Sequence, residues 1–165
     1  VRYIKENNIL NYSPENLIVL SPDAGGVDRA KAFAQRLGRN SLAFIYKRRT
    51  TEGTGDTRDV EEMILVGNVE GKDVLIVDDI IDSGTTLCKA AELLKQKGAK
   101  RLFCYGTHGF FTCGTEELKK NFEKVMTSNT HYRENNDIIT IDVSSIFAEA
   151  IYRAQMGKSI SELFK

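Results

Sequence analysis

One stretch near the middle of the chain, residues 74–97, constrains the fold more than any other. It begins with four apolar residues, Val-Leu-Ile-Val at 74–77, which indicate a fully buried strand of a parallel sheet. The apolar run ends in the carboxylates Asp78 and Asp79, and a polar loop follows. From residue 86 to 97 apolar side chains recur at helical spacing, so the stretch is predicted to be strand, loop and helix.

The loop between this strand and this helix has the composition of an anion site. A Ser-Gly-Thr loop that enters a helix offers free backbone N–H groups and hydroxyls to a phosphate, and the helix dipole favours the negative charge. Ligands of open α/β sheets bind beyond the carboxyl ends of the strands, where this loop lies. The neighbouring carboxylates suit a hydroxylated sugar, directly or through Mg²⁺. An ordinary helix cap is the alternative, but it accounts for one polar residue and not for the three carboxylates Asp78, Asp79 and Asp82.

Residues 77–86 resemble the phosphoribosyl-diphosphate (PRPP) motif of proteins with the phosphoribosyltransferase fold. The resemblance implies that Asp78 and Asp79 face the ribose hydroxyls and a metal ion. It also implies that ribose 5-phosphate is held by the following residues, here called the motif loop: Asp82, Ser83, Gly84, Thr85 and Thr86. The motif alone does not separate phosphoribosyltransferases from PRPP synthetases.

The composition is that of an ordinary globular domain. The chain has 165 residues, of which 41% are hydrophobic and 28% charged, enough for one domain with a buried core. Its 23 basic and 23 acidic residues balance, so charge favours neither a nucleic acid nor a membrane as partner. Three cysteines without C-x-x-C spacing indicate neither a disulfide framework nor a zinc site. We therefore expect a cytoplasmic protein that binds no nucleic acid and no membrane.

Strands and helices alternate along the chain. Apolar runs predict strands at 17–20, 41–46, 63–66, 74–77, 101–105, 124–127 and 138–141. Helices are predicted at 1–9, 30–37, 86–97, 115–120 and 146–154. This order predicts a single α/β domain over residues 1–165, with a central, mostly parallel sheet and helices on both faces.

Two further loops at strand ends carry candidate functional residues. Ser-Pro-Asp-Ala-Gly-Gly at 21–26 allows the backbone to approach a second anion closely, and Asp23 is able to hold a cation. Basic residues at 47–49 lead into a segment, 50–59, that we expect to be mobile and able to close over phosphoryl charge. Taken alone, residues 21–26 could equally be a plain turn, and residues 47–49 could equally be a solvated basic surface. The PRPP motif beside them favours the functional interpretation.

Together the three loops resemble the C-terminal half of ribose-phosphate diphosphokinase, the PRPP synthetase family, over nearly the whole chain. The matching segments are 21–34, 43–49, 66–100, 105–109 and 144–164. The resemblance implies a phosphoribosyltransferase-like (type I) domain, and transfer of the β,γ-diphosphoryl group of ATP to the 1-hydroxyl of ribose 5-phosphate, giving PRPP and AMP with Mg²⁺. It also implies a homo-oligomer, a hexamer in the family.

The resemblance assigns roles to residues outside the motif as well. It implies that Lys47 and Arg49 are the catalytic cations of a flexible loop. It places a metal ion near Asp23 and near Asp78 and Asp79. The implied pyrophosphate loop, here called the glycine loop, comprises Asp23, Ala24, Gly25 and Gly26, and the family's regulatory phosphate site matches Ser159 and Ser161.

Three features depart from the family pattern. Thr85 stands where the synthetases usually have a second glycine, and the segment 50–59 is longer than usual. The family's N-terminal half, which supplies much of the adenine site and a metal-binding histidine, is absent, so we expect the chain alone to bind ribose 5-phosphate or PRPP weakly and to turn over poorly or not at all. Two alternatives stay open: a phosphoribosyltransferase that uses PRPP and a base, and a non-catalytic regulatory subunit of a PRPP synthetase.

Overall fold

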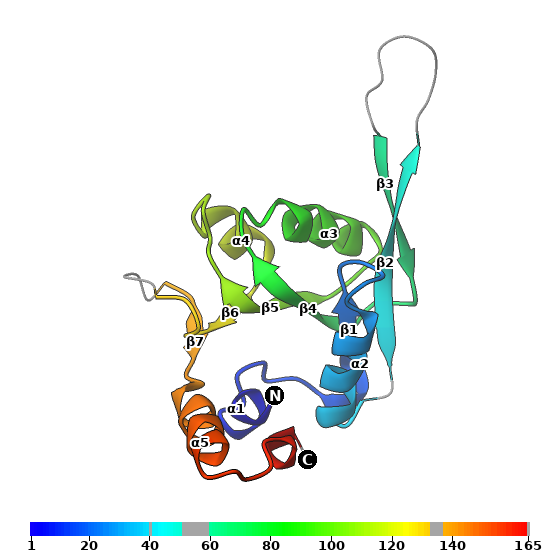
Figure 1. Cartoon of the computed structure of the whole chain (residues 1–165). Helices are drawn as coiled ribbons and strands as arrows, with labels where there is room; N and C mark the ends of the chain where they lie inside the picture. The colour runs from blue at the N-terminus through cyan, green and yellow to red at the C-terminus, as the bar shows by residue number, and fades with distance from the viewer. Residues whose placement is uncertain (40, 51–59, 133–136, 165) are drawn as a thin grey trace.

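The computed structural model describes residues 1–39, 41–50, 60–132 and 137–164, with only the backbone of residues 14, 49, 50, 60 and 61 (Figure 1). Seven strands form one sheet in the order β3-β2-β1-β4-β5-β6-β7. Neighbouring strands are parallel except β2 and β3, which are antiparallel. The strands are β1 (Leu17–Ser21), β2 (Leu42–Thr50), β3 (Val60–Val66), β4 (Asp73–Ile81), β5 (Arg101–Gly109), β6 (Lys124–Ser128) and β7 (Ile139–Ile141).

Helices cover both faces of this sheet, as predicted. Figure 1 shows α3 and α4 on one face and α1 and α2 on the other, with α5 beyond β7 on the side of α1. No helix in the described ranges is both long and apolar enough to span a bilayer. The helices are α1 (Arg2–Glu6), α2 (Val27–Arg36), α3 (Thr85–Gln96), α4 (Glu116–Asn121) and α5 (Ser144–Gln155), with 3₁₀ turns η1 (Pro14–Asn16) and η2 (Ser161–Phe164).

Alternate side chains of the central strands enter two different cores. In β4, Val74 and Ile76 pack with the buried residues of α3, whereas Leu75 and Val77 pack with those of α1 and α2. All four are 0% exposed. Because both faces are covered, the strand has no polar alternation, and this is why its sequence is a continuous apolar run.

Three strands, β2, β4 and β5, extend four residues further at their carboxyl ends than predicted. β4 continues past Val77 to Ile81, and its last residues pair with β5, Ile80 opposite His108 and Ile81 opposite Gly109. β2 likewise runs to Thr50, because every residue of β3 pairs with it, from Val66 opposite Phe44 to Val60 opposite Thr50. Residues 79 and 80 of β4 are exposed, so this part of the strand tolerates polar and charged residues that a buried strand excludes.

Candidate functional site

The candidate site lies between β1 and β4, where the connections of the sheet diverge. From β1 the chain passes through α2 on one face to β2, and from β4 it passes through α3 on the other face to β5. Adjacent parallel strands whose connections leave in opposite directions open a crevice at their carboxyl ends, which is the usual ligand site of α/β sheets. The glycine loop follows β1 and the motif loop follows β4, so both loops border this crevice.

The motif loop leads into the N-terminus of α3 without a side-chain cap. Gly84 is the N-cap residue, with a left-handed φ of 78°, and it has no side chain that could cap the first turn. A Cβ at Gly84 would lie 3.1 Å from Cγ of Leu118 in α4, so both the backbone conformation and the packing require glycine. The first N–H groups of α3 therefore face the loop with their positive dipole end, as an anion site requires.

Hydroxyl groups surround this helix end. The Oγ of Ser83 lies 3.1 Å from Oγ1 of Thr85, and the N–H of Thr85 donates to Ser83 Oγ over 3.4 Å. Both residues are exposed. The side chain of Thr85, where the family resemblance predicts a glycine, is exposed and lies beside that of Ser83.

Two carboxylates of β4 share one arginine from α2. Arg29 Nη2 lies 2.9 Å from Oδ2 of Asp79, and Nη1 lies 3.7 Å from Oδ1 of Asp78. The Asp78 side chain is 17% exposed and that of Asp79 57%, so the two carboxylates sit at different depths. Arg29 is the site residue that sequence reasoning missed. The sequence feature that could have indicated Arg29 is its position three residues after Gly26, which places it on the first turn of a helix that begins at the crevice.

The depth of the two carboxylates separates their pKa values. Burial, together with the negative charges of Asp79 and Asp23, raises the pKa of Asp78 to about 6. Burial also acts to raise the pKa of Asp79, but the hydrogen bond from Asp78 and the positive charge of Arg29 outweigh it, so the pKa of Asp79 lies below its ordinary value. The more buried carboxyl therefore takes up a proton first as the pH falls.

Asp78→Asn is expected to stabilise the fold at pH 8 and to leave its stability unchanged at pH 3. The folded-state pKa of Asp78, about 6, exceeds the unfolded value of 3.8, so ionising this group costs more in the folded state. That cost is absent below pH 3.8, grows as the pH rises and is complete above pH 6. Removing it adds about 1–3 kcal/mol to the free energy of unfolding.

Urea unfolding of both proteins at pH 3 and pH 8 measures this difference. Asp79→Asn is the matched control and is expected to lose stability at pH 8, because the pKa of Asp79 is lowered in the folded state. An Asp78→Asn variant no more stable than the parent at pH 8 would contradict the assignment of a raised pKa.

Hydrogen bonds within the glycine loop hold the side chain and the carbonyl of Asp23. Asp23 Oδ1 accepts a hydrogen bond from the N–H of Gly26 at 2.9 Å, and Ser21 Oγ donates to the carbonyl of Asp23 at 2.7 Å. A Cβ on Gly26 would lie 2.6 Å from Ser21 Oγ and 3.2 Å from Arg29 Nη1, so a larger residue would displace both neighbours. Ala24 and Gly25 are exposed at the tip.

The carboxylates fit a Mg²⁺ ion that a bound phosphate helps to hold, not a metal held by protein alone. In the part of the chain that the structure describes, no three His, Cys, Asp or Glu residues form a metal-ligating group. Mg²⁺ commonly uses one or two protein carboxylates, with phosphate oxygens and water completing its shell. Burial is the main cause of the raised pKa of Asp78, and the nearby negative charges of Asp79 and Asp23, which a cation would relieve, add to it.

The predicted catalytic cations lie on a strand and not in a loop. Lys47 pairs with Met63 and Arg49 with Glu61 in the β2–β3 hairpin, a partner that the local sequence pattern did not reveal. β1 ends at Ser21, opposite Phe44, so β2 carries Lys47 beyond the carboxyl end of β1. Among the described residues Lys47 contacts none of the site carboxylates through a hydrogen bond or ion pair. The Arg49 side chain and the segment 51–59 lie outside the described residues.

The serines of the proposed regulatory site lie apart from the crevice. Ser159 and Ser161 follow α5, and their hydroxyl oxygens are 3.3 Å apart. Arg153 holds this turn by donating to the carbonyl of Ser159 at 2.9 Å and to Glu162 at 2.8 Å. Figure 1 shows the tail next to α1, away from the N-termini of α2 and α3.

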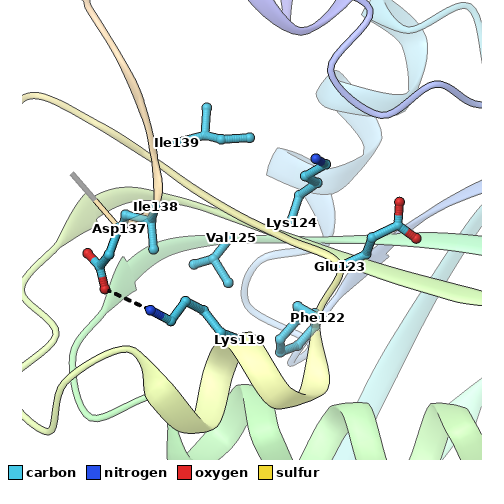
Figure 2. A pocket seen from close by; sticks show the side chains of 8 residues that line it. All are labelled: Lys119, Phe122, Glu123, Lys124, Val125, Asp137, Ile138 and Ile139. Carbon is cyan, nitrogen blue, oxygen red and sulfur yellow. Dashed lines mark hydrogen bonds and ion pairs between the residues drawn. The ribbon is translucent and has the colours of Figure 1, made fainter.

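A cavity of about 420 Å³ lies at the other edge of the sheet, and no predicted site residue lines it (Figure 2). It is formed where α4 ends and β6 begins, with an ion pair of 3.3 Å between Lys119 and Asp137 at its rim. The lining residues are Lys119, Phe122, Glu123, Lys124, Val125, Asp137, Ile138 and Ile139. This cavity is therefore separate from the crevice between β1 and β4.

Comparison with known proteins identifies relatives of the chain. It is 41% identical over 157 residues to a ribose-phosphate pyrophosphokinase of Vibrio parahaemolyticus, covering 91% of this chain and 48% of that protein. A ribose-phosphate pyrophosphokinase of Aquifex aeolicus is also 41% identical, over 167 residues, with 98% of this chain and 50% of that protein covered. The chain thus spans about half the length of the curated relatives it matches.

Comparison with solved structures also finds a phosphoribosylpyrophosphate synthetase of which this chain covers half. A phosphoribosylpyrophosphate synthetase from Mycobacterium smegmatis superposes with a TM-score of 0.75 at 27% identity, over 93% of this chain and 50% of that one. The adenine phosphoribosyltransferase (APRTase) from Giardia lamblia has a TM-score of 0.56 at 18% identity over 74% of both chains, which shows a common fold alone. The expected type of domain is thereby confirmed, and the phosphoribosyl transferase domain family matches residues 2–145. The chain belongs to the phosphoribosyl transferase domain family.

Proposed function

We propose that the chain is the C-terminal half of a PRPP synthetase, which transfers the β,γ-diphosphoryl group of ATP to the 1-hydroxyl of ribose 5-phosphate and gives PRPP and AMP. The observation that carries this proposal is the uncapped N-terminus of α3 beside the carboxylates Asp78 and Asp79, at the point where the sheet connections diverge. The 41% identity to ribose-phosphate pyrophosphokinases favours a synthetase over a phosphoribosyltransferase.

The motif loop and the strand before it would bind ribose 5-phosphate. The backbone N–H groups and hydroxyls at residues 83–86 would bind the 5-phosphate, since they combine hydrogen-bond donors with the positive end of the α3 dipole. Asp78 and Asp79 would accept hydrogen bonds from the ribose hydroxyls. Arg29 occupies Asp79 before the sugar arrives, so its ion pair with Asp79 has to open or be shared on binding.

The glycine loop would hold the diphosphoryl group of ATP. Its exposed tip, at Ala24 and Gly25, allows phosphate oxygens to approach the backbone closely. Asp23 and Asp78 would hold Mg²⁺ together with these oxygens, since the charge of Asp23 already acts on the Asp78 carboxyl. Bound Mg²⁺ supplies neutralisation of the triphosphate charge.

Charge stabilisation by cations would complete the reaction. The anomeric hydroxyl attacks the β-phosphorus in line, a reaction that depends on positioning and charge and needs no protein nucleophile. Lys47, which β2 carries past the end of β1, and Arg49 two residues later on the same strand would stabilise the negative charge that develops on the phosphoryl oxygens.

The proposal also includes the assembly of the protein, its location in the cell and a regulatory site. We expect a homo-oligomer in the cytoplasm, with a regulatory phosphate near Ser159 and Ser161. Exposed apolar side chains on α5 support an assembly, because a contiguous apolar face is rarely left in water: Ile146 is 58% exposed, Phe147 56% and Ile151 68%.

AMP formation from ATP, Mg²⁺ and ribose 5-phosphate tests the proposal. A longer parent protein that includes this chain is expected to form AMP and PRPP in equal amounts, whereas the 165-residue chain alone is expected to turn over poorly. Release of pyrophosphate from PRPP and a base, without AMP formation from ATP, would instead favour a phosphoribosyltransferase. A parent that binds ribose 5-phosphate but forms no AMP would favour the regulatory subunit.

A further inference from the structure

A side chain outside the motif loop holds one of its carboxylates. Thr112, in the segment between β5 and α4, donates a hydrogen bond from Oγ1 to Oδ1 of Asp82 at 2.6 Å. This length is typical of a hydroxyl that donates to a carboxylate, and both residues are exposed at the surface. The two residues are 30 positions apart, so the fold and not the local sequence brings them together.

The segment that carries Thr112 is fixed to the end of β4 by its backbone. The N–H groups of Phe110 and Phe111 both point to the carbonyl of Ile81, at 2.8 and 3.3 Å. Phe111 is 5% exposed and has a φ of 51°, a left-handed conformation that a bulky residue rarely adopts. The buried ring and the two hydrogen bonds maintain this turn, which directs the next residue, Thr112, back to the motif loop.

An aspartate at the position of Asp82 would otherwise bind its own loop. Asp side chains commonly accept hydrogen bonds from N–H groups two or three residues later. Asp23 does so in the glycine loop, where its Oδ1 accepts from the N–H of Gly26 at 2.9 Å. If Asp82 did the same, its negative charge would cover the N–H groups of Gly84 and Thr85 and would repel a phosphate there.

We propose that Thr112 is a positioning residue that turns the Asp82 carboxylate away from the N–H groups of the motif loop and so keeps the loop open for the phosphate of ribose 5-phosphate. This inference rests on the proposed function of the loop as a ribose 5-phosphate site. Thr112 touches no substrate in this proposal and acts through Asp82 alone.

Calorimetric titration of the 165-residue chain with ribose 5-phosphate tests the role in binding. Thr112→Val keeps the shape of the side chain and removes the donor, and it is expected to weaken binding about tenfold, because the released Asp82 carboxylate then competes with the phosphate for the loop N–H groups. Thr112→Ser retains the hydroxyl and is expected to bind like the parent. Thr112→Ala replaces the valine variant if that variant fails to fold.

Amide hydrogen exchange without ligand is the second readout. A merely structural role of Thr112 would not slow the exchange of N–H groups in the motif loop. In Thr112→Val the N–H of Gly84 is expected to exchange more slowly, because Asp82 then binds it, whereas the N–H of Thr85 already donates to Ser83 Oγ in the parent. Unchanged ribose 5-phosphate affinity together with unchanged exchange would overturn the inference. If the parent chain itself does not bind ribose 5-phosphate, the proposed function of the loop fails, while the exchange rates still decide whether Thr112 controls Asp82.

Discussion

Lys47→Ala in the longer parent protein is expected to lower the rate of AMP formation about 10²–10³-fold, the usual loss when a donor that stabilises transition-state charge is removed. The expectation follows from the path of β2, which passes beyond the last paired residue of β1 and carries Lys47 past the strand end where the glycine loop begins. A β-strand also limits the backbone freedom of the lysine, so that its charge is held near one position.

The effect should appear in turnover and not in sugar binding. Steady-state kinetics with saturating ATP are expected to give a reduced kcat with an unchanged KM for ribose 5-phosphate, since Lys47 contacts none of the described carboxylates of the sugar site. Lys124→Ala is the matched control, because it removes the same charge at the amino end of β6, at the opposite edge of the sheet. A Lys47 variant as active as this control would exclude Lys47 from catalysis.

The motif loop could be predicted from sequence because its signals are local. A continuous apolar run, a change to polar residues and a helical period all lie within residues 74–97, and each depends on backbone geometry and burial alone. The structure confirms β4, α3 and the parallel sheet between helices. The roles of the loop residues stay predictions, since sequence gives the donors and acceptors without their ligand.

Contacts between distant segments could not be predicted in this way. Arg29 reaches Asp79 from 50 residues earlier in the chain, and neither neighbourhood shows a pattern that requires a partner. The extension of β2 to Thr50 depends on its pairing with β3, which begins at Val60 and not at the predicted residue 63, and the sequence around Lys47 alone does not show this partner. Strand ends and ion pairs of this kind follow from tertiary packing, which overrides local propensity.

Gly106→Ala is expected to lower the free energy of unfolding by about 3 kcal/mol, the upper part of the range for overpacked cores. A Cβ on Gly106 would lie 2.8 Å from Cδ1 of Ile81 and closer still to its Cγ1. Ile81 is 1% exposed, and its backbone is paired with Gly109, so the side chain has little room to move away. The backbone of Gly106 does not have a positive φ, so this cost is steric and does not arise from strain.

A double-mutant cycle with Ile81→Ala separates the steric cause from a general loss of stability. Ile81→Ala alone is expected to cost about 2–5 kcal/mol, as large-to-small core changes do. Because it removes Cγ1 and Cδ1, the added methyl of Gly106→Ala then enters the vacated space, and urea unfolding should show a double variant more stable than the sum of the two losses. Additive losses would mean that Ile81 is not the residue that requires glycine at 106. The same clash would shift the carbonyl that holds the turn before Thr112, so we also expect weaker ribose 5-phosphate binding by any Gly106→Ala protein that remains folded.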